Sequence, residues 1–262
     1  MEVHHHPDLQ HRRKKFKEYF LEFLMIFLAV TLGFFAESFR EHLAETSKER
    51  EYMKEICENL KYDTIRCSLN AQRNVLLLKG MDSLRAELKA AVRGEVQTNK
   101  LYYFNLSYGA QLNEAVFNTS AITELKNSGS LRLIGNRKIV NLVSDYYERQ
   151  ITAAMSYDPQ LQSIELQKKE GLFFSLIDLD SYVNSFGKID TDNYKNDFNY
   201  QQILEKKPSL TLINSDPKSL EELYNSETKY VIALQTYNFW LIYCKNAATN
   251  LIGEIEKEYH LN

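Results

Sequence analysis

The sequence predicts an all-α protein with an N-terminal transmembrane helix, and its turn residues, length and apolar periodicity lead to that prediction. Only nine glycines and four prolines occur among 262 residues, too few for the frequent turns of a β-sandwich or β-barrel. A chain of this length and composition buries a hydrophobic core, which excludes intrinsic disorder. Three cysteines cannot form a disulfide framework, and a formal net charge of -3 gives no general reason to bind nucleic acid.

The first predicted element is the apolar stretch over residues 19–36, YFLEFLMIFLAVTLGFFA, whose only charged residue is Glu22. Eighteen helical residues span about 27 Å, close to the ~30 Å hydrocarbon core of a bilayer. Acidic residues prevail after the stretch, and five basic residues precede it, namely Arg12, Arg13, Lys14, Lys15 and Lys17. The positive-inside rule then predicts a cytoplasmic basic tail over residues 1–18 and an extracytoplasmic remainder.

Two alternatives to an uncleaved anchor stay open, a cleaved signal peptide and a buried helix of a soluble protein. Cleavage after Ala36 would place Phe34 at the minus-three position, where a small residue is preferred. We therefore favour the anchor. Glu22 lies one helical turn from the basic end of the span, so we favour an interfacial position near Lys15 and Lys17 over a functional intramembrane carboxylate.

Two segments resemble a known group of proteins. They are residues 4–41, which read HHHPDLQHRRKKFKEYFLEFLMIFLAVTLGFFAESFRE, and residues 125–134, which read LKNSGSLRLI. Both are similar to bacterial single-pass membrane proteins known only as a domain of unknown function, specifically over the first 41 residues and more loosely beyond. The resemblance implies a bacterial, membrane-anchored protein with a helical exterior domain. Together with the charge pattern, it leads us to expect the inner membrane, with the C-terminal domain in the periplasm. It implies no activity, cofactor or catalytic residue.

Charged residues dominate residues 37–52, which predicts a helical stalk that continues the membrane helix. A seam of apolar residues with seven-residue spacing follows and stops near Gly94, a predicted helix end. Polar residues interrupt this seam at Asp63, Asn70 and Asn74. Its apolar members are Met53, Ile56, Leu60, Cys67, Leu77, Leu84 and Leu88. Such a long helix must pack on other helices of the chain or on a second copy.

A second long helix is predicted from Asp216, a favourable N-cap, and Pro217 at the first helical position. Ten of the twelve positions in its 3–4 series are apolar or aromatic. The series is Leu220, Leu223, Glu227, Tyr230, Leu234, Tyr237, Leu241, Cys244, Ala248, Leu251, Ile255 and Glu258. The segment 230–243 is apolar on nearly every face, which predicts a central position in the fold.

Shorter helices are predicted between the two long ones. Thr119 or Ser120 caps a helix that ends at Gly129, and Asn136 caps a longer helix that Pro159 kinks or breaks.

A polar loop is predicted over residues 178–215, with one short helix at residues 200–206. Residues 53–262 are thus expected to form an elongated antiparallel helical bundle.

The sequence contains no Gly-rich phosphate loop and no H-E-x-x-H, G-x-S-x-G or paired C-x-x-C motif. We therefore expect no enzymatic activity and no cofactor. Residues 190–201 match a calcium loop poorly, because Lys195 and Gln201 replace its glycine and glutamate. A disordered tail is favoured over a metal site for the histidine cluster, since nothing fixes its geometry. That cluster comprises His4, His5, His6, Asp8 and His11.

The cysteines are expected to be small buried side chains. Cys57 and Cys67 would lie about 15 Å apart along one helix, beyond disulfide reach. The alternatives are a bond from one of them to Cys244 or a cross-link between protomers. Core packing is likewise favoured over a ligand pocket or an interface for the aromatic residues Tyr102, Tyr103, Phe104 and Tyr108.

These observations predict a membrane-anchored interaction or scaffold protein, an accessory subunit of a cell-envelope assembly. Its expected partners are the lipid bilayer, other envelope membrane proteins and a second copy of the chain, without nucleic acid. The alternative is an extracytoplasmic ligand-binding sensor module that signals through a partner membrane protein. A closed pocket lined by Tyr, Asn and Arg would favour sensing, whereas a solid core with an exposed apolar face would favour scaffolding.

Overall fold

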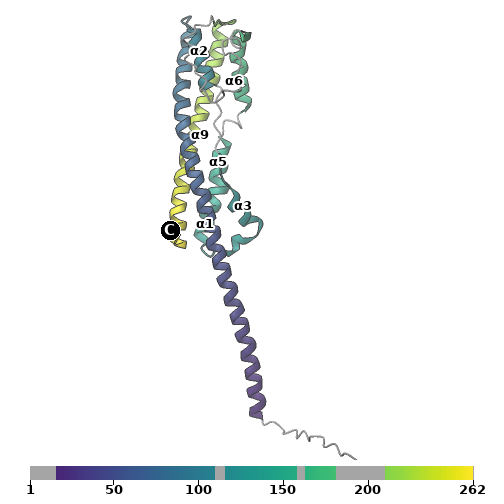
Figure 1. Cartoon of the computed structure of the whole chain (residues 1–262). Coiled ribbons are helices and arrows are strands. Elements are labelled where there is room, and N and C mark those ends of the chain that lie inside the picture. Colours follow the sequence, from purple (N-terminus) through teal and green to yellow (C-terminus); the bar gives the residue numbers. More distant parts are fainter. Residues whose placement is uncertain (1–15, 110–115, 158–162, 181–209, 262) are drawn as a thin grey trace, which may run out of the picture. The chain divides into compact units, whose positions relative to one another are not determined.

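The computed structural model is all-α, as predicted, and it describes residues 16–109, 116–157, 163–180 and 210–261. Within these ranges the structure contains helices and an isolated antiparallel bridge between Ile177 and Leu212, and no named strand. The chain divides into two compact units, residues 1–51 and 52–262. Figure 1 displays the helices along the chain.

Helix α1 runs without interruption over Phe16–Val92 and contains no proline. The predicted membrane segment and stalk are therefore parts of one helix. Its end matches the predicted stop, since Gly94 has a φ of 82°, a left-handed conformation that glycine adopts without strain. The backbone N–H of Glu95 donates to the carbonyl oxygen of Ala90 over 2.9 Å and closes this turn.

Helix α1 is also the one helix of the described chain that is long and apolar enough to cross a membrane. None of the residues in its most apolar window is buried. An apolar helix surface of this length is unfavourable in water and favourable in hydrocarbon. Length and composition thus support a single membrane-spanning helix in the first unit.

Helix α9, Pro217–Tyr259, begins as predicted, because the Asp216 side chain accepts a hydrogen bond from the Ser219 N–H over 3.1 Å. In the second unit it runs antiparallel to α1 (Figure 1). Two contacts fix that register. Lys61 Nζ lies 2.7 Å from Glu256 Oε1, and Arg85 Nε donates to Thr228 Oγ1 over 3.1 Å.

Shorter helices cover the two long ones. At one end of α9 lies α6, Ser163–Leu176, and at the other end lies a helical run that includes α4, η3 and α5. This run is made of α4 at Arg137–Ser144, a π-helix η3 at Asp145–Gln150 and α5 at Ile151–Ser156. The remaining elements are α2 at Thr98–Phe104, the π-helix η1 at Asn105–Gly109, α3 at Ser120–Asn127 and the 3₁₀-helix η2 at Ser130–Leu133.

The predicted positions of these helix ends are largely confirmed, although Thr119, at the N-cap position of α3, makes no capping hydrogen bond through its side chain. The Asn136 side chain accepts from the N–H groups of Lys138 and Ile139, and Gly129 adopts a left-handed φ of 68° just after α3. The helical run ends at Ser156, before the proline that was predicted to break it. That proline, the calcium-like loop and the short helix predicted at residues 200–206 lie outside the described residues.

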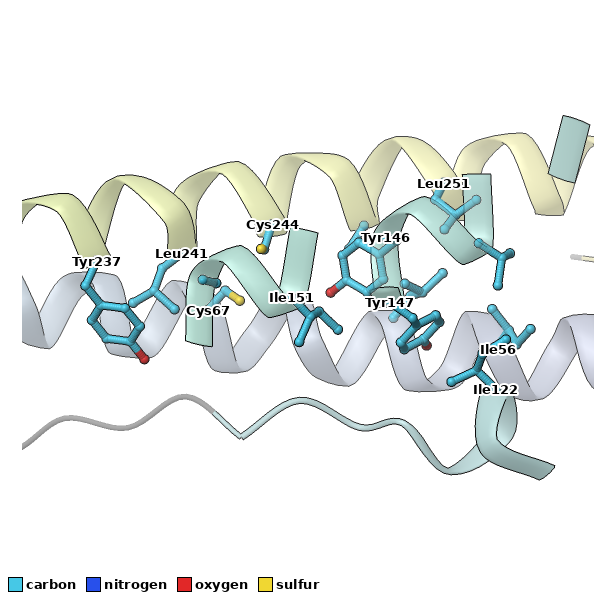
Figure 2. Packing of buried hydrophobic residues seen from close by; sticks show 14 of the residues in the cluster. Ile56, Cys67, Ile122, Tyr146, Tyr147, Ile151, Tyr237, Leu241, Cys244 and Leu251 are labelled. Atoms are coloured by element: carbon cyan, nitrogen blue, oxygen red, sulfur yellow. The ribbon is translucent and has the colours of Figure 1, made fainter. Parts of the chain in front are cut away.

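All seven apolar members of the predicted α1 seam are buried, and so are the polar residues Asp63, Asn70 and Asn74 between them. The α9 series is buried as well, except for Glu258. Figure 2 shows the two helices with side chains of η3 between them. Each buried aliphatic side chain contributes about 1.5–3 kcal/mol, so this seam between α1 and α9 is a major contributor to the stability of the bundle.

The predicted central position of segment 230–243 is wrong. Ile232, Phe239, Ile242 and Tyr243 expose between 43% and 60% of their surfaces. The reason is geometric, since α9 packs on neighbours along one side and keeps an outward face. Uniform apolarity therefore does not indicate burial on all sides here.

Candidate functional site

The most distinctive surface of the second unit is a line of exposed apolar side chains on α1. We define the α1 stripe as Tyr62, Ile65, Leu69 and Leu76, whose side chains are exposed by 44%, 61%, 55% and 63%. Their spacing of three, four and seven residues places them along one helix face, roughly opposite the buried seam. An exposed apolar line with helical spacing is typical of a surface that binds another helix.

Positive charge surrounds the α1 stripe. Between Glu58 and Asp82, the only carboxylate on α1 is Asp63, which is completely buried. The same interval contains four basic residues, Lys61, Arg66, Arg73 and Lys79. Lys61 pairs with Glu256 of α9. The face that carries the stripe is therefore apolar and basic.

A second exposed apolar feature is an aromatic cluster on α9. The Phe239 and Tyr243 rings stack with centroids 6.4 Å apart, and Trp240 stacks on Tyr157 of the α5 end at 6.1 Å. Trp and Tyr are enriched at protein interfaces because each supplies a large apolar surface at a small entropic cost. No acidic residue occurs on α9 between Glu227 and Glu254.

A surface groove of about 330 Å³ lies between α4–η3 and α9. Leu142 and Tyr146 line this groove, and Asn250 contributes polar lining. The ion pair of Lys138 with Glu254 also lies along it. Groove volumes of this size accommodate small molecules. The π-helix η3 contributes to this lining, and π-helical turns are frequent at functional sites.

Asp63 is the polar centre of the core next to this groove. Its Oδ1 accepts the backbone N–H of Asn118 over 2.7 Å, and its Oδ2 accepts the Tyr146 hydroxyl over 3.0 Å. Burial raises the pKa of the Asp63 carboxyl to about 6, although both hydrogen bonds oppose that rise. One side chain thus links α1, η3 and the segment that leads into α3.

A second buried polar group connects α6, α9 and η1. Lys169 Nζ lies 3.1 Å from Glu227 Oε2, and these side chains are only 1% and 0% exposed. The same ammonium donates to the Gly109 carbonyl oxygen and lies 4.6 Å from the centroid of the Tyr230 ring. Burial lowers the pKa of Lys169 and raises the pKa of Glu227, while their mutual attraction opposes both shifts. The pair closes the core where three elements meet.

The three cysteines are buried free thiols, as predicted. Cys67 of α1 and Cys244 of α9 occupy the core beside η3 (Figure 2), and Cys244 Sγ lies 3.6 Å from the Gln150 carbonyl oxygen. Burial raises the pKa of each of these two thiols to about 12, which keeps them protonated and unreactive. Tyr102 is likewise a core residue, and its hydroxyl donates to the Thr211 carbonyl oxygen over 2.9 Å.

The sequence-predicted topology residues are only partly described. Lys17 and Glu22 are exposed positions near the start of α1. Arg12, Arg13, Lys14 and Lys15 lie outside the described residues, as does the histidine cluster. Among the side chains that the structure describes, no group of three or more His, Cys, Asp or Glu residues is gathered for a metal ion. The α1 stripe, Asp63 and the buried ion pair were not singled out as sites from the sequence.

No protein-family model, curated protein or solved structure matches this chain significantly. The fold defines the class, an all-α protein whose described residues include one candidate membrane-spanning helix, near the N-terminus.

Proposed function

We propose that this protein is a membrane-anchored helical interaction protein that acts as an accessory subunit of a bacterial cell-envelope assembly, without catalysis. The α1 stripe carries this proposal. Four apolar side chains, each 44% exposed or more, follow one helix face of a bundle whose seam is otherwise packed. Such a face is unfavourable in water and gains free energy when a partner covers it.

The proposed location is the bacterial inner membrane, with the N-terminus in the cytoplasm and the bundle in the periplasm. The basic cluster from Arg12 to Lys17 supports this orientation, because cationic residues flank the cytoplasmic end of membrane helices. The same cations interact favourably with anionic lipids. A reporter fused after Asn262 that is active only outside the cytoplasm would support the orientation, and a cytoplasmic signal would contradict it.

Other envelope membrane proteins are the partners that we propose for the bundle, and a second copy is the partner that we propose within the membrane. The long predicted helix was expected to pack on other helices of the chain or on a second copy, and the chain's own helices bury its seam over residues 53–88. In the membrane segment, Phe20, Phe27 and Phe34 recur every seven residues and are all exposed. A seven-residue aromatic repeat suits helix pairing in the bilayer.

Mild-detergent extraction followed by mass measurement tests both contacts. We expect the wild-type chain to elute with a partner protein, and Leu69→Lys to lose that partner because a buried cation opposes an apolar interface. Phe27→Ala is expected to reduce self-association and to leave the partner bound. A wild-type chain that elutes as a bare monomer at micromolar concentration would exclude both.

The groove between α4–η3 and α9 favours one alternative function, a ligand-binding sensor module. Asn250 and the Lys138–Glu254 ion pair line this groove and give it polar groups suited to a small polar molecule. Thermal unfolding in the presence of a metabolite library tests this alternative. A ligand that raises the midpoint of the wild type but not of Asn250→Leu would favour sensing over scaffolding.

A further inference from the structure

We infer that the partner of the α1 stripe is an amphipathic helix whose apolar face is flanked by acidic side chains. This inference rests on the proposed interaction function and adds the chemistry of the partner. Ile65, Leu69 and Leu76 have the spacing with which helices interlock, and no acidic side chain of α1 other than buried Asp63 lies between Glu58 and Asp82.

The flanking cations are placed to meet acidic groups. Arg66 and Arg73 are seven residues apart and follow Tyr62 and Leu69 by four, so they form one edge of the stripe. Arg73 is exposed and Arg66 is partly exposed. A carboxylate from a docked helix can therefore approach these guanidinium groups from solvent and form charge-assisted hydrogen bonds with them.

A second copy fits this stripe poorly. Two α1 stripes brought together would place Arg66, Arg73 and Lys79 of one chain against the same cations of the other. Like charges across an interface oppose association, whereas opposite charges select and orient a partner. The midsection of α9 offers no compensating acid, since its charged residues between Glu227 and Glu254 are Lys229 and Lys245.

Two designed peptides test the inference with the full-length chain in neutral-lipid nanodiscs. Both have leucine at the core positions of about four heptads, and one has glutamate and the other lysine at every flanking position. Like-charged flanks prevent either peptide from pairing with itself. Fluorescence anisotropy is expected to give at least about tenfold tighter binding of the glutamate peptide, with an affinity that falls as salt is raised.

Variants of the chain locate the binding. Leu69→Lys is expected to weaken the glutamate peptide by about tenfold or more, and Arg66→Gln with Arg73→Gln to bring the two peptides close to equal affinity. Gln235→Lys adds the same charge to an exposed position of α9 and is expected to change nothing. Circular dichroism of each variant verifies that the helices form.

Three outcomes would overturn the inference: equal binding of the two peptides, a preference for lysine, or binding that Leu69→Lys does not reduce. If the nanodiscs hold two copies of the chain and Leu69→Lys separates them, the occupant of the α1 stripe is a second copy instead. In each case the proposed interaction function is judged separately, by whether the wild-type chain is extracted with a partner protein. A partner without an acidic helix would leave that function intact and exclude the acidic occupant.

Discussion

Asp63 and Glu227 each occupy a position in an apolar seam, and each is completely buried. Their partners come from distant parts of the chain, the Tyr146 hydroxyl for Asp63 and the Lys169 ammonium for Glu227. A buried polar group is tolerated only when it is paired, so these residues select one arrangement of the surrounding helices. Each of these two buried residues leads to a prediction that can be measured.

Asp63→Asn is expected to remove a pH dependence of stability. The folded pKa of about 6 lies above the ordinary value of 3.8, so the folded chain holds a proton that the unfolded chain has lost between these values. The free energy of unfolding therefore falls as pH rises through this window, by up to about 3 kcal/mol. Asparagine has no such proton and can retain both hydrogen bonds.

Urea unfolding of the two chains between pH 4 and pH 8 measures this effect. The advantage of Asp63→Asn over the wild type should be small at pH 4 and should grow through about pH 6. An advantage that stays constant across the range would contradict a raised pKa at Asp63.

Lys169→Met is expected to destabilise the bundle by about 3–5 kcal/mol, because it leaves the Glu227 carboxylate buried without a counter-ion. The double variant with Glu227→Leu should recover most of that loss, since no unpaired charge is left. Lys61→Met is the matched control, because the Lys61–Glu256 pair is exposed by 56% and 36% and should contribute less than about 1 kcal/mol. A double variant no more stable than Lys169→Met would contradict the pairing.

At the scale of the element, α1 has two apolar faces in the second unit with different roles. Leu77 is 6% exposed and packs in the core, whereas the adjacent Leu76 is 63% exposed in the α1 stripe. Neighbouring residues on a helix differ by about 100° in direction. Substitutions at these two consecutive leucines therefore test the buried face and the exposed face of the same helix separately.

Leu77→Ala is expected to reduce the free energy of unfolding by about 2–5 kcal/mol through a cavity and lost burial. Leu76→Ala should change it by less than about 0.5 kcal/mol, because its side chain is already in solvent. Denaturant unfolding of the two variants compares them directly. Similar losses for both would mean that the face assigned to the core is wrong.

Local signals made several helix ends predictable. Gly94, Gly129, Asn136 and Asp216 act through their own backbone conformation or a hydrogen bond within one turn, which the sequence alone specifies. The buried seam was equally predictable, because its seven-residue period reflects helix geometry. The π-helical turn at η3 was not, since Tyr146 and Tyr147 both become buried through tertiary packing.

The candidate site could not be derived from the sequence for a related reason. Apolar residues lie on two faces of α1, and only the fold decides which face the chain itself covers. Asp63 was taken as an interruption of the seam because its partners, Asn118 and Tyr146, are 55 and 83 residues away. For segment 230–243 the error was the reverse. The sequence predicted burial on all sides, but its outward face has no cover among the described residues.

At the scale of the whole molecule, the two units have different roles in the proposed function. The first contains the candidate membrane helix, and the second contains a packed bundle with an exposed apolar face. Under the proposed function, an anchor would confine the bundle to the membrane surface, where partners are concentrated and a modest interface is sufficient for association.

The most direct measurement of this account compares photo-crosslinking in cells from Leu69 and from Leu77. A photoreactive phenylalanine at Leu69 is expected to form a covalent product with another polypeptide, because this position lies in the exposed stripe. The same group at Leu77 should crosslink only within the chain, because the core surrounds it. Intermolecular products from Leu77, or none from Leu69, would contradict the interaction surface assigned to α1.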